Sequence, residues 1–203
     1  ITQIQCTSAS IPAGLRKRFM EKFSIPLQDC YGISELGGPL TFQTPEDAKN
    51  YSDVSVPLAE IDVSIRKGNE LWIRSPFAML GYLKNGSITP PFDKDGFMDT
   101  GDLALNISDK IQIIGRKKDI IIRGGINVSP VRIESLLSMI SEVEEVAVVG
   151  IENSFWGEKI IGCIVTKMDD IKDLENSIFQ FCKDNLAEHE RPDHIMILEQ
   201  FPR

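Results

Sequence analysis

Residues 115–130, GRKKDIIIRGGINVSP, restrict the fold more than any other segment of the sequence. A basic segment leads into an apolar strand, and a double glycine then permits a tight turn. Ser129 and Pro130 supply the cap and the first residue of a helix. The composition also changes here, so we expect a domain boundary near residues 115–118.

The part of the chain after this boundary alternates helix and strand. Strands are predicted at residues 143–151, 160–167 and 194–198. Between them, apolar residues recur at the three- and four-residue spacing of two amphipathic helices. The first carries Ile133, Leu136, Leu137 and Ile140, and the second carries Leu174, Ile178, Phe181, Cys182 and Leu186. Residues 119–203 therefore predict a compact α+β domain with a core of its own.

The first part of the chain predicts a β-α-β start, with an apolar run at residues 4–9 and a helix at 12–23. Leu15, Phe19 and Phe23 recur at four-residue spacing on one face of that helix. Residues 45–114 then read as short strands separated by turns such as Asn85-Gly86. This middle region predicts a small antiparallel sheet or barrel.

Charge and composition narrow the classes of partner. The 203 residues carry a net charge of −8, which argues against a broad grip on nucleic acid and favours a small-molecule partner. No apolar run approaches the ~20 residues of a membrane helix. The four cysteines form no CxxC pair, so neither a disulfide framework nor a structural zinc site is expected, and a reducing cytoplasm is the natural compartment.

Several familiar binding motifs are absent. There is no GxGxxG, and Ser87 stands where a P-loop beginning at Gly81 would need lysine. His189 and His194 are too far apart for a zinc HExxH helix. A calcium loop ending at Asp102 would place Pro91 at its first ligand position, where proline offers no side-chain oxygen.

Three clusters could carry chemistry, and each also has an ordinary structural explanation. Residues 31–38 combine an aromatic ring, a hydroxyl and a carboxylate on a glycine-rich loop, which suits a base, a phosphate and Mg²⁺, or forms a turn with a buried tyrosine. Residues 96–102 place Asp102 in a tight turn, where a carboxylate can bind a ribose diol or close an acidic hairpin. The basic residues at 115–118 are either ligand contacts or a solvated surface.

The order and spacing of these clusters resemble the adenylate-forming enzymes, the family of acyl-CoA synthetases, luciferases and peptide-synthetase adenylation domains. YGISE at residues 31–35 is similar to the family's YGxTE, TGD at 100–102 to its TGD, and residues 115–134 to its GRxKDxIxxxGxNxxPxxIE. The resemblance covers essentially the whole chain. It implies that residues 1–115 are the C-terminal part of a large AMP-binding domain, with a β-barrel subdomain at 45–114. It further implies a hinge at 116–118 and a truncated small α+β domain at 119–203.

Members of this family use ATP and Mg²⁺ to activate a carboxylic acid as an acyl-adenylate, and then transfer the acyl group to a thiol. The resemblance implies that Tyr31 stacks on adenine beside Gly32, and that Asp29 or its backbone meets the adenine amino group. Ser34 would contact phosphate, and Glu35 would ligate Mg²⁺. The remaining implied nucleotide contacts are to the ribose, from Asp102 to its diol and from Arg116, which with Glu35 is a candidate catalytic residue.

The resemblance also assigns residues to the second half of the reaction. Lys118 matches the hinge about which the small domain rotates between adenylation and thioester formation. Gly125, with Gly124 beside it, would line the passage for the pantetheine of coenzyme A, where the lack of a side chain lets the thiol pass.

Two elements of the family pattern are missing from the sequence. The Ser-, Thr- and Gly-rich phosphate loop does not precede Tyr31, and the lysine of a PxTxSGK element does not follow Pro202. Residues 8–10 match the family's Gly-Ala-Pro turn only loosely, so the acid is not specified. We therefore expect part of an acyl-CoA synthetase that is inactive alone. The alternatives are a ligase that loads the phosphopantetheine of a carrier protein, and a non-catalytic binding module.

Overall fold

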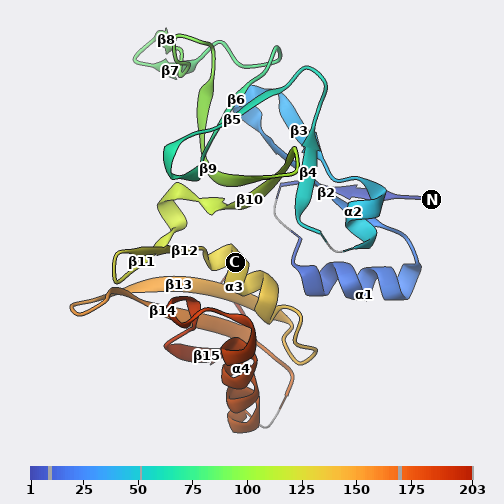
Figure 1. Ribbon diagram of the computed structural model, residues 1–203, viewed down its shortest axis with the longest axis vertical. Helices are drawn as coiled ribbons and strands as arrows, with labels where there is room; N and C mark the ends of the chain where they lie inside the picture. The colour runs from blue at the N-terminus through green and yellow to red at the C-terminus, as the bar shows by residue number, and fades with distance from the viewer. Residues whose placement is uncertain (9–10, 51, 169–170, 203) are drawn as a thin grey trace. The chain divides into compact units, whose positions relative to one another are not determined.

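A computed structural model describes residues 1–8, 11–50, 52–168 and 171–202 (Figure 1). The chain divides into two compact units. The first comprises residues 1–11 and 18–117, and the second comprises residues 12–17 and 118–203.

The first unit is built on an eight-stranded sheet with the order β1-β2-β3-β4-β10-β9-β6-β5. β1 and β2 are parallel, and the other neighbours are antiparallel. A separate hairpin pairs β7 with β8. The strands are β1 (Ile4–Cys6), β2 (Leu27–Ile33), β3 (Gly38–Phe42), β4 (Val54–Pro57), β5 (Asp62–Ile65), β6 (Glu70–Arg74), β7 (Tyr82–Lys84), β8 (Ser87–Thr89), β9 (Met98–Ile107) and β10 (Lys110–Arg116).

The predicted β-α-β start is confirmed, because helix α1 (Ala13–Phe23) connects the parallel strands β1 and β2. The apolar face of this helix is not its buried face. Leu15 and Phe23 are exposed, and the buried residues of the helix are Gly14 and Arg16. The apolar face instead forms a local contact, with the ring centroids of Phe19 and Phe23 4.7 Å apart.

The middle region follows the predicted turns but contains a helix that the sequence pattern missed. Thr44 caps the short helix α2 (Pro45–Lys49), since its side chain accepts a hydrogen bond from the Asp47 N–H at 3.1 Å. Asn85 and Gly86 both have positive φ and close the β7–β8 hairpin as expected. The strand pairs follow an open path and close no barrel within the described residues. The expected α/β and α+β class is confirmed, with an open sheet in place of the barrel.

One side of the sheet in the first unit packs into a hydrophobic core. Alternate residues of β6, Leu71 and Ile73, are fully buried there, as the two-residue period of a strand requires. The buried members of this core are Leu36, Leu40, Ile61, Leu71, Ile73, Met98, Ala104 and Ile111. Leu36 anchors the turn η1 (Ser34–Leu36) in it, and this turn carries two of the candidate site residues.

The second unit has a five-stranded sheet with two helices. β14 is central, with β13 antiparallel on one side, and with β15 parallel and β11 antiparallel as further partners, while β12 pairs with β11. The elements are β11 (Ile121–Arg123), β12 (Ile126–Val128), α3 (Pro130–Leu137), β13 (Glu145–Asn153), β14 (Gly157–Val165), α4 (Ile171–Asn185) and β15 (His194–Leu198). The short turns η2 (Lys67–Asn69), η3 (Lys117–Asp119) and η4 (Glu188–Glu190) complete the chain.

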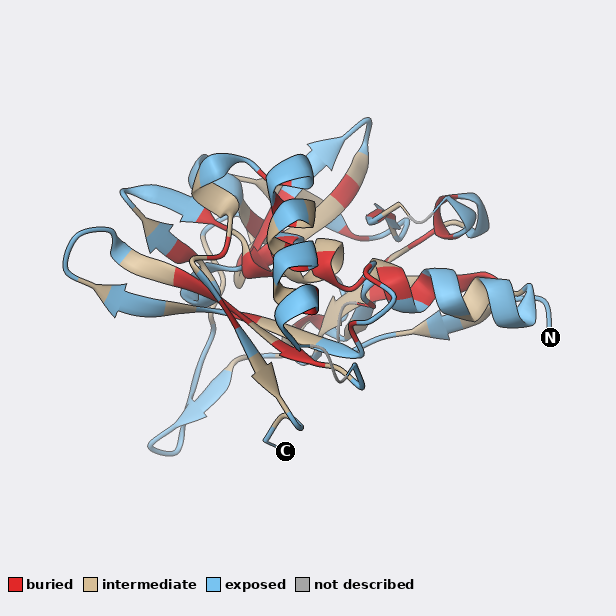
Figure 2. Ribbon diagram, turned by 90° about the horizontal axis from the view of Figure 1, so that it is seen from below, coloured by how far each residue is buried: buried red, intermediate tan, exposed pale blue. Residues whose placement is uncertain are grey.

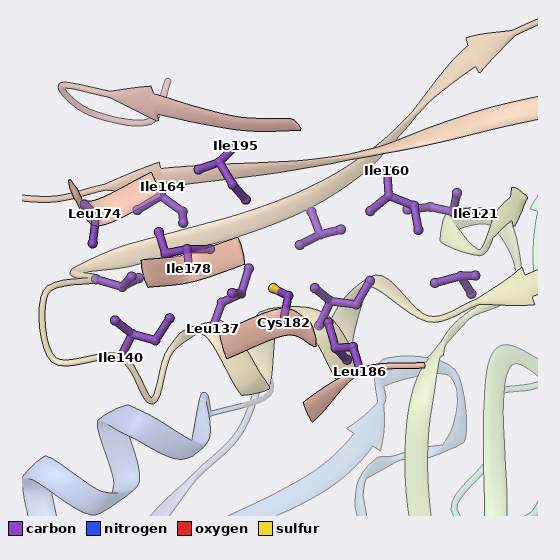
Figure 3. Packing of buried hydrophobic residues seen from close by; sticks show 14 residues of the cluster. Ile121, Leu137, Ile140, Ile160, Ile164, Leu174, Ile178, Cys182, Leu186 and Ile195 are labelled. Atoms are coloured by element: carbon purple, nitrogen blue, oxygen red, sulfur yellow. The ribbon is translucent and has the colours of Figure 1, made fainter. Parts of the chain in front are cut away.

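The core of the second unit is formed by residues of both helices and the sheet, and Figure 3 shows the side chains of α3 and α4 meeting those of the strands. Ser129 caps α3 as predicted, because its Oγ accepts the Arg132 N–H at 3.3 Å. The predicted apolar positions of α4 are buried at Leu174, Ile178 and Cys182, while its other side is exposed (Figure 2). The helical period in this part of the sequence therefore identified the packed faces correctly.

None of the helices in the described part of the chain has the length and apolarity needed to traverse a lipid bilayer. The four cysteines are free thiols.

Candidate functional site

A hollow of about 420 Å³ lies in the first unit, within the range of small-molecule sites. Its walls come from the residues after β1, the end of β2, the turn η1, the start of β3 and the end of β10. The lining residues are Thr7, Ser8, Gly32, Ile33, Ser34, Glu35, Gly38, Pro39 and Arg116.

Gly32 shapes one wall of this hollow because it lets two strands approach closely. A Cβ atom on Gly32 would lie 2.0 Å from the carbonyl oxygen of Gly38 in β3, which is sterically impossible. The pairing of β2 and β3 is irregular at this point, between Tyr31 and Gly32. The chain then turns into η1, which brings Ser34 and Glu35 to the hollow.

Asp102 joins two of the sequence clusters in three dimensions. Its Oδ2 accepts a hydrogen bond of 2.7 Å from the Tyr31 hydroxyl, across 71 positions of sequence. Its Oδ1 lies 3.3 Å from Nε of Arg116, which is its cross-strand neighbour in β10. Asp102 itself is only 4% exposed, and its backbone N–H donates to the Thr100 hydroxyl. Burial, together with the hydrogen bond to Asp102, raises the pKa of Tyr31, so the phenol keeps its proton and remains a donor.

Glu35 lies at the edge of the hollow with its carboxylate partly exposed. Its Oε1 accepts a hydrogen bond of 3.1 Å from the Tyr82 hydroxyl. Within the described residues, no three His, Cys, Asp or Glu side chains are grouped to enclose a metal ion. A single carboxylate beside the hydroxyl of Ser34 fits Mg²⁺, which completes its shell with water and phosphate oxygens. The donor set therefore suits a metal that arrives with a nucleotide.

Asp29 does not line the hollow. It lies in β2 opposite Cys6 of β1, and its Oδ2 accepts the Ile11 N–H at 3.4 Å. Its backbone is also engaged, because the Asp29 N–H donates to the side-chain oxygen of Gln43 at 3.0 Å. Through these contacts Asp29 joins β2 to β1 and to the residues around Ile11 and Gln43, and this structural role is separate from any contact with a base.

Lys117 forms a cluster that sequence reasoning did not single out. Its Nζ lies 2.8 Å from a carboxylate oxygen of Glu70 in β6 and 2.8 Å from one of Asp99 in β9. The hydrogen bond from Lys117 lowers the pKa of Glu70. Partial burial alone would raise the pKa of Asp99, but Lys117 and the Gly101 N–H outweigh it and lower that pKa as well. These two carboxylates raise the pKa of Lys117, which is the last residue of the first unit.

We expect Lys117→Met to lower the thermal unfolding midpoint of the chain near pH 7 and to matter progressively less in acid. The two carboxylates have lowered pKa values in the folded chain, so their stabilisation is complete above the unfolded value of about 4 and disappears as the pH falls through the folded values. The lysine has a raised pKa, so its contribution disappears only as the pH rises through that value, above about 10.4. Midpoints measured from pH 2 to 8 test this, and identical curves for the two proteins would contradict it.

In the second unit, the double glycine forms the turn of the β11–β12 hairpin. Gly124 and Gly125 have φ of 57° and 81°, the left-handed torsions that a two-residue hairpin turn requires. The Gly124 N–H donates to the carbonyl of Trp156 at 2.7 Å, and a Cβ atom at Gly124 would lie 3.4 Å from the Trp156 ring. A Cβ atom at Gly125 would meet nothing within 4 Å. The turn thus presents bare backbone beside a half-exposed indole.

The structure brings one group of the predicted site residues together. Gly32, Ser34, Glu35 and Arg116 line the hollow. Tyr31 and Arg116 both contact Asp102, and we call these three residues the Asp102 cluster. Lys118, Gly124 and Gly125 belong to the second unit. Sequence reasoning missed Tyr82, Lys117 and Trp156, because their contacts depend on pairing across the fold. Ser8 lines the hollow, and its φ of 82° is unusual for a residue with a side chain. Ala9 and Ser10, the other two residues of the turn that matches the family only loosely, lie outside the described residues.

Comparison with known proteins agrees with this arrangement. Residues 132–203 match the model of the AMP-binding enzyme C-terminal domain. The chain is 32% identical to a long-chain-fatty-acid–CoA ligase of Yersinia pestis, over 87% of the chain and 33% of that protein. It is 28% identical to the peroxisomal butyrate–CoA ligase AAE11 of Arabidopsis thaliana, over 99% of the chain and 40% of that protein.

Among solved structures, the anthranilate CoA ligase AuaEII in complex with anthranoyl-AMP has the same fold, with a TM-score of 0.89 over 100% of this chain and 42% of that one, at 24% identity. The chain thus spans between a third and about two fifths of the length of these proteins.

The family model and the relatives together show that the chain belongs to the family of AMP-binding enzymes, and the solved structure shows the same fold. The relatives named above are all ligases that join an acid to coenzyme A.

Proposed function

We propose that the chain is part of an ATP-dependent acid–thiol ligase of the acyl-CoA synthetase class. In the first step a carboxylate oxygen attacks the α-phosphorus of ATP, the bond to the β-phosphate oxygen breaks, and pyrophosphate leaves an acyl-adenylate. In the second, a thiol attacks the acyl carbon, the bond to AMP breaks, and a thioester forms. The observation that carries this proposal is the convergence of Tyr31, Asp102 and Arg116 beside the hollow of Ser34 and Glu35.

The Asp102 cluster suits the nucleoside end of ATP. Asp102 uses one contact on each oxygen, so the two oxygens keep further lone pairs with which to accept the vicinal hydroxyls of a ribose. The Tyr31 hydroxyl is already committed to Asp102, which leaves the ring face as the part of this residue that a base can cover. Arg116 is 59% exposed at its side chain and can contact the ribose from the opposite side. The carboxylate or backbone of Asp29 would then serve the adenine amino group.

Ser34 and Glu35 suit the phosphate end. A serine hydroxyl can donate to a phosphate oxygen, and the Glu35 carboxylate would hold Mg²⁺. The bound metal would offset negative charge on the triphosphate. Negative charge builds up on the phosphate oxygens as pyrophosphate leaves. Positively charged groups fixed beside these oxygens therefore stabilise the transition state of adenylation more than they stabilise bound ATP. Among the described residues that line this hollow, Arg116 is the cationic side chain.

The Gly124–Gly125 turn suits the thiol end. The open space beside Gly125 would let a thin pantetheine chain pass, with the Trp156 ring as an apolar wall. Lys118, the first residue of the second unit after the boundary, is the proposed hinge. Coenzyme A is the proposed acceptor, because the relatives named above are CoA ligases. A reducing compartment, the cytoplasm, suits the free thiols of the chain.

Carboxylate-dependent exchange of label between pyrophosphate and ATP tests the proposal. The complete protein that carries this chain is assayed with a panel of aliphatic and aromatic acids. We expect exchange with at least one acid, and we expect none from the 203 residues alone, which have neither the phosphate loop nor the PxTxSGK lysine. Acyl transfer from the activated acid to coenzyme A, compared with transfer to a carrier-protein phosphopantetheine, identifies the acceptor.

Two results would contradict the proposal. Absence of exchange with every acid, in a complete protein that still binds ATP, would favour the non-catalytic binding module. Exchange by the 203 residues alone would show that the two missing elements are dispensable for adenylation.

A further inference from the structure

The turn that carries Glu35 is fixed by a segment far away in the sequence, residues 75–82 between β6 and β7. The Met79 N–H donates to the Glu35 carbonyl at 2.8 Å, and the Ser75 hydroxyl donates to the Leu36 carbonyl at 2.9 Å. A Cβ atom on Gly37 would lie 2.5 Å from Cβ of Phe77, so the two backbones are in close contact. A single turn of this kind has little rigidity of its own. Its geometry therefore depends on the 75–82 segment.

The same segment ends at Tyr82, whose hydroxyl donates to Oε1 of Glu35 at 3.1 Å. Tyr82 is the first residue of the β7–β8 hairpin and pairs with Thr89. A Cβ atom on the preceding Gly81 would lie 2.6 Å from the Thr89 carbonyl oxygen, so the hairpin begins with a tight backbone approach that sets the direction of the tyrosine. Within the described residues, Oε2 of Glu35 receives no hydrogen bond.

We propose that Tyr82 is a positioning residue for Glu35, holding Oε1 so that Oε2 is presented to the metal of a bound metal–nucleotide. The chemical reason is that a phenol donating to Oε1 restricts rotation of a long, partly exposed side chain, while Oε2 keeps its lone pairs for a metal ion. Tyr82 would take no part in bond making or proton transfer, because it only donates a hydrogen bond to Glu35. This inference rests on the proposed function, in which Glu35 is a metal ligand.

The test measures metal binding directly. Mn²⁺ in place of Mg²⁺ is titrated into the complete enzyme with ATP, and free Mn²⁺ is followed by electron paramagnetic resonance. We expect Tyr82→Phe to raise the dissociation constant of Mn²⁺ by about three- to tenfold, the effect of one partly exposed hydrogen bond to a charged group. ATP binding measured in EDTA should be unchanged, because Tyr82 acts only on the metal ligand.

Leu83→Ala is the matched control, since Leu83 is on the same strand and 75% exposed, and it should bind Mn²⁺ as the unaltered enzyme does. Unchanged Mn²⁺ affinity in Tyr82→Phe, with affinity lost in Glu35→Gln, would overturn the positioning role and leave the proposed function standing. Unchanged affinity in Glu35→Gln would overturn the metal role of Glu35 and with it the positioning role, while pyrophosphate exchange would still decide the proposed function. A rise in ATP dissociation constant in EDTA for Tyr82→Phe would show a general structural defect and overturn the positioning role.

Discussion

Replacing Asp102 with asparagine is expected to reduce kcat/KM for ATP in the adenylation step by about 100-fold in the complete enzyme. The substitution keeps the shape of a buried side chain but removes its charge and one of its two acceptor oxygens. Two hydrogen bonds from ribose hydroxyls to an ionised group contribute about 1.5 kcal/mol each, and about 1.4 kcal/mol corresponds to tenfold. Initial rates of pyrophosphate exchange at varied ATP provide the measurement.

Tyr31→Phe is the control for this prediction, because it removes the hydroxyl that binds Asp102 and keeps the ring proposed to cover adenine. We expect a loss several times smaller than in Asp102→Asn. Thermal unfolding of each variant without nucleotide separates a binding defect from a folding defect. The ribose assignment fails if Asp102→Asn keeps full exchange activity, or if both variants lose activity only in proportion to lost folded protein.

The second large effect is expected from Gly125→Leu, which should reduce thioester formation by about 100-fold or more and leave pyrophosphate exchange nearly unchanged. The reason is steric: the position is open space in the structure, and a branched side chain would fill the passage proposed for pantetheine. The substitution also places a side chain at a φ of 81°, which costs roughly 1–2 kcal/mol of stability. The two half-reactions are measured separately, as exchange and as acyl-thiol release.

Gly68→Leu is the matched control for the backbone cost. Gly68 lies in the turn before β6 with a φ of 77°, and a Cβ atom there would meet nothing within 4 Å. The variant should lose a similar amount of stability and keep both half-reactions. Equal thioester formation in Gly125→Leu and Gly68→Leu would exclude Gly125 from the thiol path.

The local structure of the second unit could be predicted from its sequence because each element has a local physical cause. Ser129 begins a helix through its own hydroxyl, and the four-residue spacing in α4 marks the face that is buried at Leu174 and Ile178. The failures have causes that are not local. The apolar face of α1 follows the same spacing rule, yet Leu15 and Phe23 are exposed, since periodicity shows that a face is apolar and cannot show what covers it.

For the candidate site, the motifs identified the residue types but not their partners. The spacing of residues 31 and 102 in the sequence does not indicate that the Tyr31 hydroxyl donates a hydrogen bond to Asp102. This contact depends on the order of strands β2, β3, β4, β10 and β9 in the sheet. The same holds for Tyr82 with Glu35, which are 47 positions apart.

Lys117 lies directly before the proposed hinge, and its two ion pairs affect how the chain can rotate at the domain boundary. Two carboxylates on separate strands hold this side chain, so the backbone up to residue 117 is fixed to the sheet. If Lys118 is the hinge, the pivot is one Cα step of about 3.8 Å beyond that tether, and it has only two soft dihedral angles. Such a short junction restricts the directions in which the chain can rotate at this point, and because the chain also passes between the two units at residues 11–12 and 17–18, the same rotation has to be accommodated there as well.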